Sequence, residues 1–183
     1  MKLSGIIQKL WDDFNVAFAD ANVFKWSVWW SLSLSGYVLV SQYIQLYWEE
    51  IEAHGELNTL NGGVESLATL FSAVATYAIG RVNGDWDKYG DIIMAIVAMG
   101  LGVVLYFLSC TESLIKSYAY YIIFCCIYQT MVTISSTEVA KFLKRNCYAL
   151  IFGFNKLMAY ILIIIFTVFV IEDKSFSFDI RKQ

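Results

Sequence analysis

Polar side chains repeat at helical spacing within long apolar stretches of this chain, and these residues are the ones that could do chemistry. An unpaired polar group is costly to place in lipid, so each must find a partner, a cavity or water. The stripes are Ser31, Ser35, Gln42 and Gln45; Glu65, Thr69, Ser72 and Thr76; Tyr118, Tyr121, Cys125, Gln129 and Ser136, with Tyr128 at the margin; and Asn155, Lys156 and Tyr160. A single Ser or Thr there more often bonds its own or a neighbouring helix, whereas Gln42 and Gln129 fit a cavity wall equally well.

Two charged residues belong to these stripes. Glu65 stands at the start of its stretch, where a carboxylate stabilises a helix N-terminus or takes part in ion or substrate coupling. Lys156 stands inside its stretch, where its ammonium group either reaches back to the membrane edge or faces a cavity and attracts an anion. Both alternatives stay open for both residues.

The composition excludes several other kinds of site. The four cysteines form no CxxC pair and there is one histidine, so we predict neither a metal site nor a disulfide framework. A net charge of −3 gives no basic surface for nucleic acid. No nucleophile stands with a base, and no glycine-rich phosphate loop occurs, so we expect no enzyme and no cofactor.

Helices that cross a membrane must position the polar stripes. Hydrophobic residues make up 58% of the 183 residues, charged residues 16%, and there is no proline. In soluble domains, hydrophobic residues make up roughly 45–50% and charged residues about 25%. Five blocks are long enough to span a bilayer, which takes roughly 20 helical residues. They are Trp26–Trp48, Val64–Val82, Ile92–Ser109, Leu114–Thr137 and Tyr148–Ile171. The predicted fold class is an all-α membrane protein.

The segments outside these blocks predict the orientation. Residues 1–25 form an amphipathic lead-in, which either lies on the inner membrane surface or packs beneath the bundle. This lead-in and the 83–91 and 138–147 loops carry most of the Lys and Arg, so the positive-inside rule places them, and the N-terminus, in the cytoplasm. Residues 172–183 are then an extracellular tail.

The third block differs from the other four. Between Asp91 and Tyr106 it carries no polar side chain. We expect the polar faces of the other four spans to converge on a shared hollow, and the third span to face lipid.

Several short motifs accompany the spans. They are Trp11–Phe14, Lys25–Trp30, Gly36-Tyr37, Tyr43–Trp48, Asn61-Gly62 with Glu65, Ala73–Gly80 and Tyr148–Asn155. Together they resemble the second half of the reduced folate carrier and thiamine transporter family, over nearly everything from Trp11 onward. The resemblance implies a major-facilitator-type solute carrier of the plasma membrane, with two six-helix halves that rock around a central site. The five spans would be the seventh to the eleventh, so the chain reads as a fragment, and its partner would be the missing N-terminal half.

The resemblance also implies a vitamin substrate. Folate carriers place an arginine and a lysine where this chain has Cys125 and Ile163, so it modestly favours thiamine over folate. Lys156 is a possible anion-attracting substitute. Candidate substrate-binding residues would line one wall of a midplane cavity and recognise a planar heterocycle by hydrogen bonds and stacking. They are Tyr37, Gln42, Tyr121, Cys125 and Tyr128.

A non-transporting membrane scaffold or regulatory fragment is the alternative function. It would keep every helix and need no polar cavity. Five spans alone would leave polar stripes uncovered, so we predict that this piece is poorly stable by itself.

Overall fold

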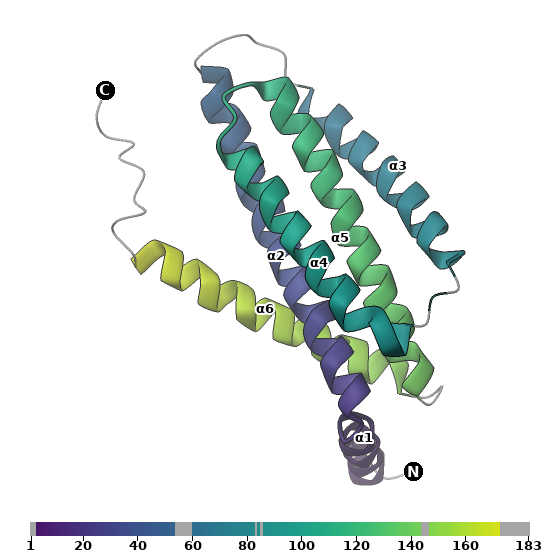
Figure 1. The fold of residues 1–183 in the computed structure, drawn as a ribbon. Coiled ribbons are helices and arrows are strands. Elements are labelled where there is room, and N and C mark those ends of the chain that lie inside the picture. The colour runs from purple at the N-terminus through teal and green to yellow at the C-terminus, as the bar shows by residue number, and fades with distance from the viewer. Residues whose placement is uncertain (1–2, 54–59, 83, 85, 144–146, 173–183) are drawn as a thin grey trace.

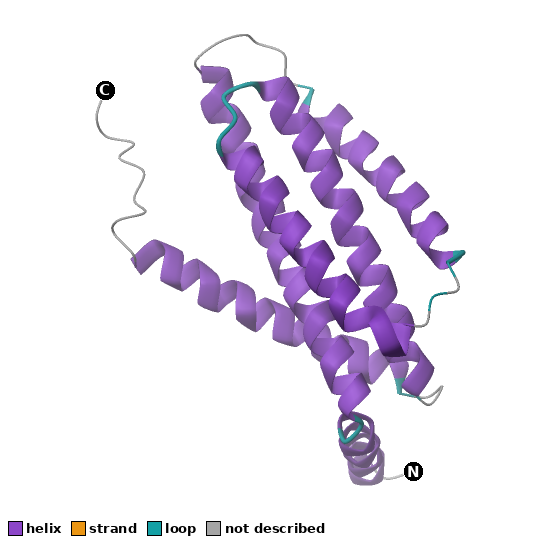
Figure 2. Cartoon of the chain, in the orientation of Figure 1, coloured by secondary structure: helices purple, strands orange, loops and turns teal. Residues whose placement is uncertain are grey.

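The computed structural model describes residues 3–53, 60–82, 84, 86–143 and 147–172, and within them it is a bundle of α-helices without strands (Figures 1 and 2). The helices are α1 (Leu3–Phe18), α2 (Ala21–Ala53), α3 (Asn61–Gly80), α4 (Trp86–Ser109), α5 (Leu114–Phe142) and α6 (Tyr148–Glu172). The all-α prediction is confirmed. Residues 173–183 of the predicted tail lie outside the described part.

Helix α5 is the centre of the bundle. It packs against α2, α3 and α4, whereas α6 packs mainly against α2. In its most apolar 18-residue window 44% of the residues are buried, against 11% in α3 and in α4. Figure 1 shows α2 to α5 side by side, while α6 leaves the bundle at a steep angle. Partners on several sides explain why α5 buries a broad face, while its opposite side, with Ile115 and Ile123, stays exposed.

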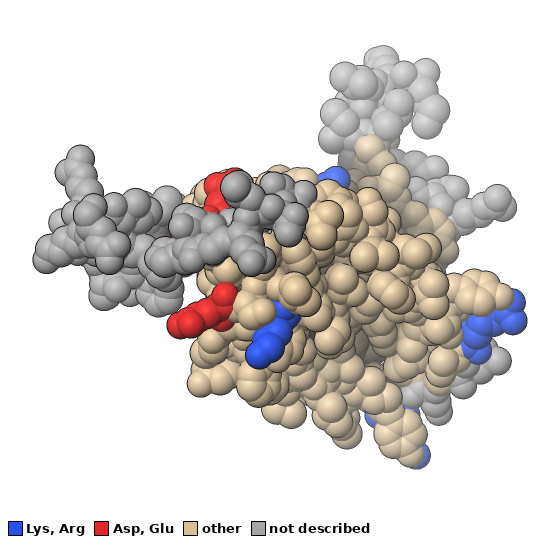
Figure 3. Space-filling model, turned by 90° about the horizontal axis from the view of Figure 1, so that it is seen from above, with Lys and Arg blue, Asp and Glu red and all other residues tan. Residues whose placement is uncertain are grey.

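Four helices of the described part are long and apolar enough to cross a membrane, at Asn61–Gly80, Lys88–Ser109, Leu114–Phe142 and Tyr148–Phe169. Helix α2, the predicted first span, has 33 residues, but its Trp, Tyr, Ser and Gln side chains lower its mean hydropathy. Its passage through the membrane stays a prediction. Seen from above in Figure 3, the visible surface is mostly uncharged, with a few charged side chains scattered over it.

Two apolar clusters hold the bundle together, one toward each end of α5. One cluster surrounds Trp48 and Tyr121, and the other surrounds Trp26 and Met131. Both tryptophans are completely buried. The Trp48 indole N–H donates to Ser117 Oγ at 2.8 Å, so a polar bond accompanies the packing at that end.

A polar seam joins α2 to α6. Asn155 is buried, and its Nδ2 donates to Ser27 Oγ at 3.0 Å. Ser31 Oγ donates to the Asn155 carbonyl, also at 3.0 Å. These members of the polar stripes therefore bond a neighbouring helix, as membrane helices commonly do.

The outer helices are equally exposed. Helix α4 presents Ile92, Ile96 and Met99 outward, while α3 presents Leu70 and Val74. Burial therefore does not set the predicted lipid-facing third span apart from α3.

Helix α1 lies at one end of the bundle, beside α2 and α6. Phe14 and Phe18 contact the Phe154 ring of α6, with centroids 4.9 and 5.2 Å apart. Trp11 is 63% exposed. The last turns of α1 thus pack on the bundle while Trp11 stays uncovered.

Candidate functional site

Helices α3 and α5, together with one residue of α2, line a half-open cavity of about 310 Å³. Its lining consists of Tyr37, Glu65, Ala68, Thr69, Ser72, Ala73, Thr76, Cys125, Tyr128 and Gln129. The volume falls at the lower end of the range typical of small-molecule sites. The whole polar stripe of α3 therefore faces part of the polar stripe of α5, as their helical spacing predicts.

Small side chains on α3 make room for this cavity. Ala68 and Ala73 alternate with Thr69, Ser72 and Thr76 on the face turned toward α5. The Thr76 hydroxyl is buried and has no hydrogen-bond partner among the described residues. The residue spacing in the sequence already predicts this polar stripe. However, Thr69, Ser72 and Thr76 were not among the candidate substrate-binding residues predicted from the sequence.

An aromatic stack forms the wall contributed by α2 and α5. The Tyr37 and Tyr128 rings are 4.1 Å apart and within 6° of parallel. The Phe124 ring continues the stack at 6.3 Å from Tyr37. A further planar ring can stack on aromatic planes of this kind.

A hydrogen bond fixes the single carboxylate of the lining. The Tyr121 hydroxyl donates to Glu65 Oε1 at 2.9 Å. Tyr121 is fully buried and contacts the Trp48 ring edge-on at 5.2 Å. Nearby, the Tyr118 hydroxyl donates to Asn61 Oδ1 at 2.6 Å, a second bond between the same two helices. Tyr121 thus lies behind Glu65 and orients it, rather than lining the cavity itself.

Two predicted site residues lie apart from this cavity. The Gln42 side chain is exposed and does not line it. Gln42 follows Tyr37 by five residues, about 140° around a helix, so the two cannot share one face. Lys156 is exposed on α6, with its Nζ 5.9 Å from the Tyr160 ring. The structure brings together Tyr37, Glu65, Tyr121, Cys125 and Tyr128; binding roles for all seven stay predictions.

No group of three or more His, Cys, Asp or Glu residues that could hold a metal ion occurs in the described part of the chain. The lining of this cavity offers one carboxylate, hydroxyls, a thiol and an amide. Such groups suit recognition by hydrogen bonds and stacking.

Comparison with known proteins identifies the chain's relatives. The model of the reduced folate carrier family matches residues 2–183. The chain belongs to the reduced folate carrier family. Human thiamine transporter 1 is 31% identical over 178 residues, which are 97% of this chain and 36% of that protein. Folate transporter 1 of Caenorhabditis elegans is 31% identical over 176 residues, 96% of this chain and 39% of that protein.

The human reduced folate transporter is 29% identical over 162 residues, 86% of this chain and 27% of that protein. The chain therefore spans about a third of the length of these curated relatives. The predicted family is confirmed, and the reduced folate carrier family is one of vitamin transporters, not of enzymes.

Proposed function

We propose that this chain supplies one half of the pathway through which a reduced folate carrier family member moves a B vitamin across the plasma membrane. The α3–α5 cavity would be one wall of the substrate site. Its lining combines the flat Tyr37–Tyr128 stack with hydroxyl groups and one fixed carboxylate. Ring stacking and directed hydrogen bonds are the interactions that a planar heterocycle requires.

The charge of the lining favours thiamine over folate as the substrate. Among the residues that line the cavity, Glu65 is the one acidic residue, and none of them is Lys, Arg or His. A carboxylate attracts the positively charged thiazolium ring of thiamine and repels the carboxylates of folate. Cys125, where folate carriers are expected to have a cation, lines this cavity without a charge. This observation carries the proposal.

The second wall would come from the N-terminal half of the carrier. The cavity is bounded by α3, α5 and one residue of α2, and its lining includes no residue of the described part of α6. A carrier that alternates access between two halves places its site at their interface. With the N-terminus in the cytoplasm, Glu65 would stand at the extracellular side of this site, where a cation would first meet it.

Uptake of labelled thiamine and labelled folate by cells that express the full-length carrier tests this proposal. We expect thiamine uptake to exceed folate uptake. Glu65→Gln should lower thiamine uptake about tenfold or more, because a hydrogen bond or ion contact to a charged group is worth about 1.5–3 kcal/mol. Glu49→Gln is the matched control, since Glu49 is an exposed carboxylate away from the cavity.

Three outcomes would contradict the proposal: preferential folate uptake, equal effects of the two glutamine substitutions, or uptake of neither vitamin. The last would favour a scaffold function. Surface expression of each variant, measured by an external label, shows that reduced uptake does not come from lost protein.

A further inference from the structure

Helix α1 runs across the end of the bundle at which α6 begins. Figure 1 shows α1 almost end-on, whereas α2 to α5 are seen from the side. The connection to α2 is short, since α1 ends at Phe18 and α2 begins at Ala21. In this turn the Asn22 backbone N–H donates to the Asp20 carboxylate at 2.8 Å. A tight turn therefore sets the direction of α1 relative to the bundle.

An apolar face of α1 is only partly covered by the bundle. Leu10, Trp11, Phe14 and Phe18 recur at spacings of three and four residues, so they share one face of the helix. Phe14 and Phe18 are half-buried and contact the Phe154 ring of α6. Leu10 and Trp11, one turn earlier, are 43% and 63% exposed. The Trp11 ring lies 5.8 Å from the Phe14 ring and within 14° of parallel, so it extends the packed aromatic row outward.

The contact with Phe154 gives the level of this apolar face in the membrane. Phe154 belongs to a segment long and apolar enough to cross a membrane, Tyr148–Phe169. It stands six residues after the start of that segment, which is a depth of at most about 9 Å at about 1.5 Å per residue. A helix that lies in the membrane interface buries its apolar face by about 5–10 Å, which is a matching depth. Further into the segment, Leu157 and Ile161 are exposed, so the surface beside α1 continues as apolar side chains.

The side chains of α1 suit a phospholipid surface that is held without charge. Tryptophan is favoured at membrane–water interfaces, because its ring is apolar while its N–H reaches the headgroups. Helix α1 contains one lysine, Lys9, and two aspartates, Asp12 and Asp13, of which Asp12 is exposed. This balance gives no attraction to anionic headgroups. Burial of apolar side chains must therefore supply the binding free energy.

We propose that α1 docks on the phospholipid surface at this end of the bundle and inserts Leu10 and Trp11 at the boundary between headgroups and acyl chains. In the predicted orientation this surface is the inner leaflet. The lead-in then lies on the membrane, and not in the water beneath the bundle. The docked helix would hold the start of α2 at a fixed depth. This docking is independent of the proposed vitamin site.

Nitroxide spin labels on the full-length carrier in phosphatidylcholine vesicles test this docking. The label is attached to Trp11→Cys or, as the matched control, to Val16→Cys, in a carrier whose accessible native cysteines, Cys110 among them, are replaced by serine. Val16 is 62% exposed, nearly as much as Trp11, but five residues later it points about 140° away around the helix. We expect the label at position 11 to collide mainly with oxygen, which concentrates among acyl chains. The label at position 16 should collide mainly with a water-soluble nickel chelate.

Each other pattern of collisions overturns the proposal. Access of the nickel chelate to both positions would place α1 in water. Exclusion of both probes from position 11 would mean that protein, such as the N-terminal half of the carrier, covers this face. Insertion only after phosphatidylserine is added would mean that charge holds the helix.

Quenching of tryptophan fluorescence by lipids brominated on their acyl chains needs no label, and it decides the matter if Trp11→Cys does not fold. The wild-type carrier should lose a larger fraction of its fluorescence than Trp11→Phe, which keeps an aromatic ring beside Phe14. Equal fractional losses would overturn the proposal as well.

Discussion

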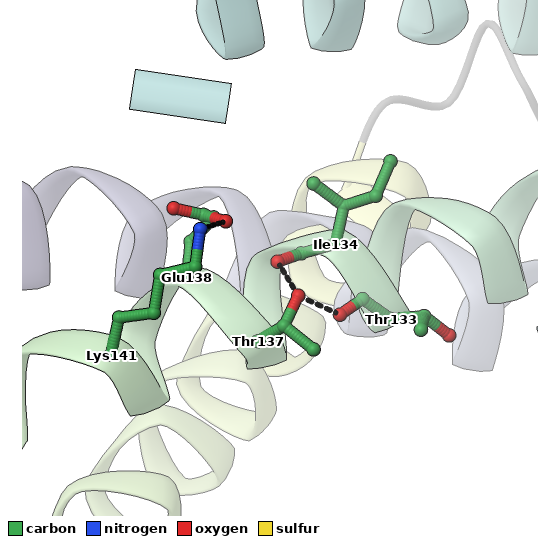
Figure 4. Close-up of polar contacts among 5 residues, drawn as sticks. All are labelled: Thr133, Ile134, Thr137, Glu138 and Lys141. Atoms are coloured by element: carbon green, nitrogen blue, oxygen red, sulfur yellow. Dashed lines mark hydrogen bonds and ion pairs between the residues drawn. The ribbon is translucent and has the colours of Figure 1, made fainter. Parts of the chain in front are cut away.

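The two carboxylates that face the α3–α5 interface stand in opposite electrostatic settings. Glu65 lies near the start of α3, where the helix dipole favours a negative charge, and it is held by the neutral hydroxyl of Tyr121. Glu138 lies in the last turns of α5, where the dipole opposes a negative charge, and it needs the ammonium of Lys141, which donates to its Oε1 (Figure 4). Position along the helix therefore decides which carboxylate is stabilised by its own helix and which needs a positive charge beside it.

The packing around the two carboxylates differs as well. At the Glu65 end, Trp48 supports Tyr121 through ring contact and also bonds Ser117. At the other end, Trp26 fits against Gly90 of α4, and its indole N–H has no hydrogen-bond partner within the described ranges of the chain. One tryptophan is fixed by a hydrogen bond to a neighbouring helix, whereas the other is held by close packing and by the Lys25 ammonium 5.2 Å from its ring.

Trp48→Ala should have the largest effect on stability. It removes a fully buried ring, leaves Ser117 Oγ without its donor and withdraws the support behind Tyr121. We expect a loss of about 3–5 kcal/mol in the free energy of unfolding. Chemical denaturation in detergent measures it. Trp11→Ala is the matched control, because that ring is exposed; equal losses for the two would show that Trp48 does not support the Glu65 end.

Gly90→Ala should have the next largest effect, at the opposite end. A Cβ atom at this position would come within 2.7 Å of the buried Trp26 ring. Because that ring has no room to retreat, we expect a loss of about 1–3 kcal/mol. The matched control is Gly100→Ala, on the same helix, where no atom lies within 4 Å. There, alanine should be neutral or stabilising by up to about 1 kcal/mol. Equal Tm values for the two variants would contradict fixation by close packing.

Much of this arrangement could be predicted from the sequence, because the facing polar stripes of α3 and α5 obey one helical period. Glu65, Thr69, Ser72 and Thr76 repeat every three or four residues, and the structure places all four on the cavity. The family could be predicted as well, since its motifs are spread over nearly the whole chain.

The face of α2 could not be predicted, because its surroundings change along its length. Ser31 and Gln42 share a face by spacing, yet Ser31 is buried against α6 while Gln42 is exposed. Helix α6 diverges from the bundle (Figure 1), so it covers that face only near its own beginning. Residue spacing predicts which residues share one face of a helix. Which helix packs against that face depends on the crossing angles between helices, and these cannot be read from a single sequence.

Tyr121→Phe should have the smallest effect on stability and the most local one. The substitution keeps the ring that packs on Trp48 and removes only the donor to Glu65 Oε1. Hydrogen bonds between membrane helices average about 0.6 kcal/mol and reach about 1.7, so the loss of stability should lie in that range. If Tyr121 orients Glu65 for the substrate, thiamine uptake should fall further than this loss explains. The matched control is Tyr106→Phe, whose ring is exposed on α4. Unchanged uptake with Tyr121→Phe would show that the Glu65 carboxylate acts without that hydroxyl, and the difference between the two carboxylates would then rest on helix position alone.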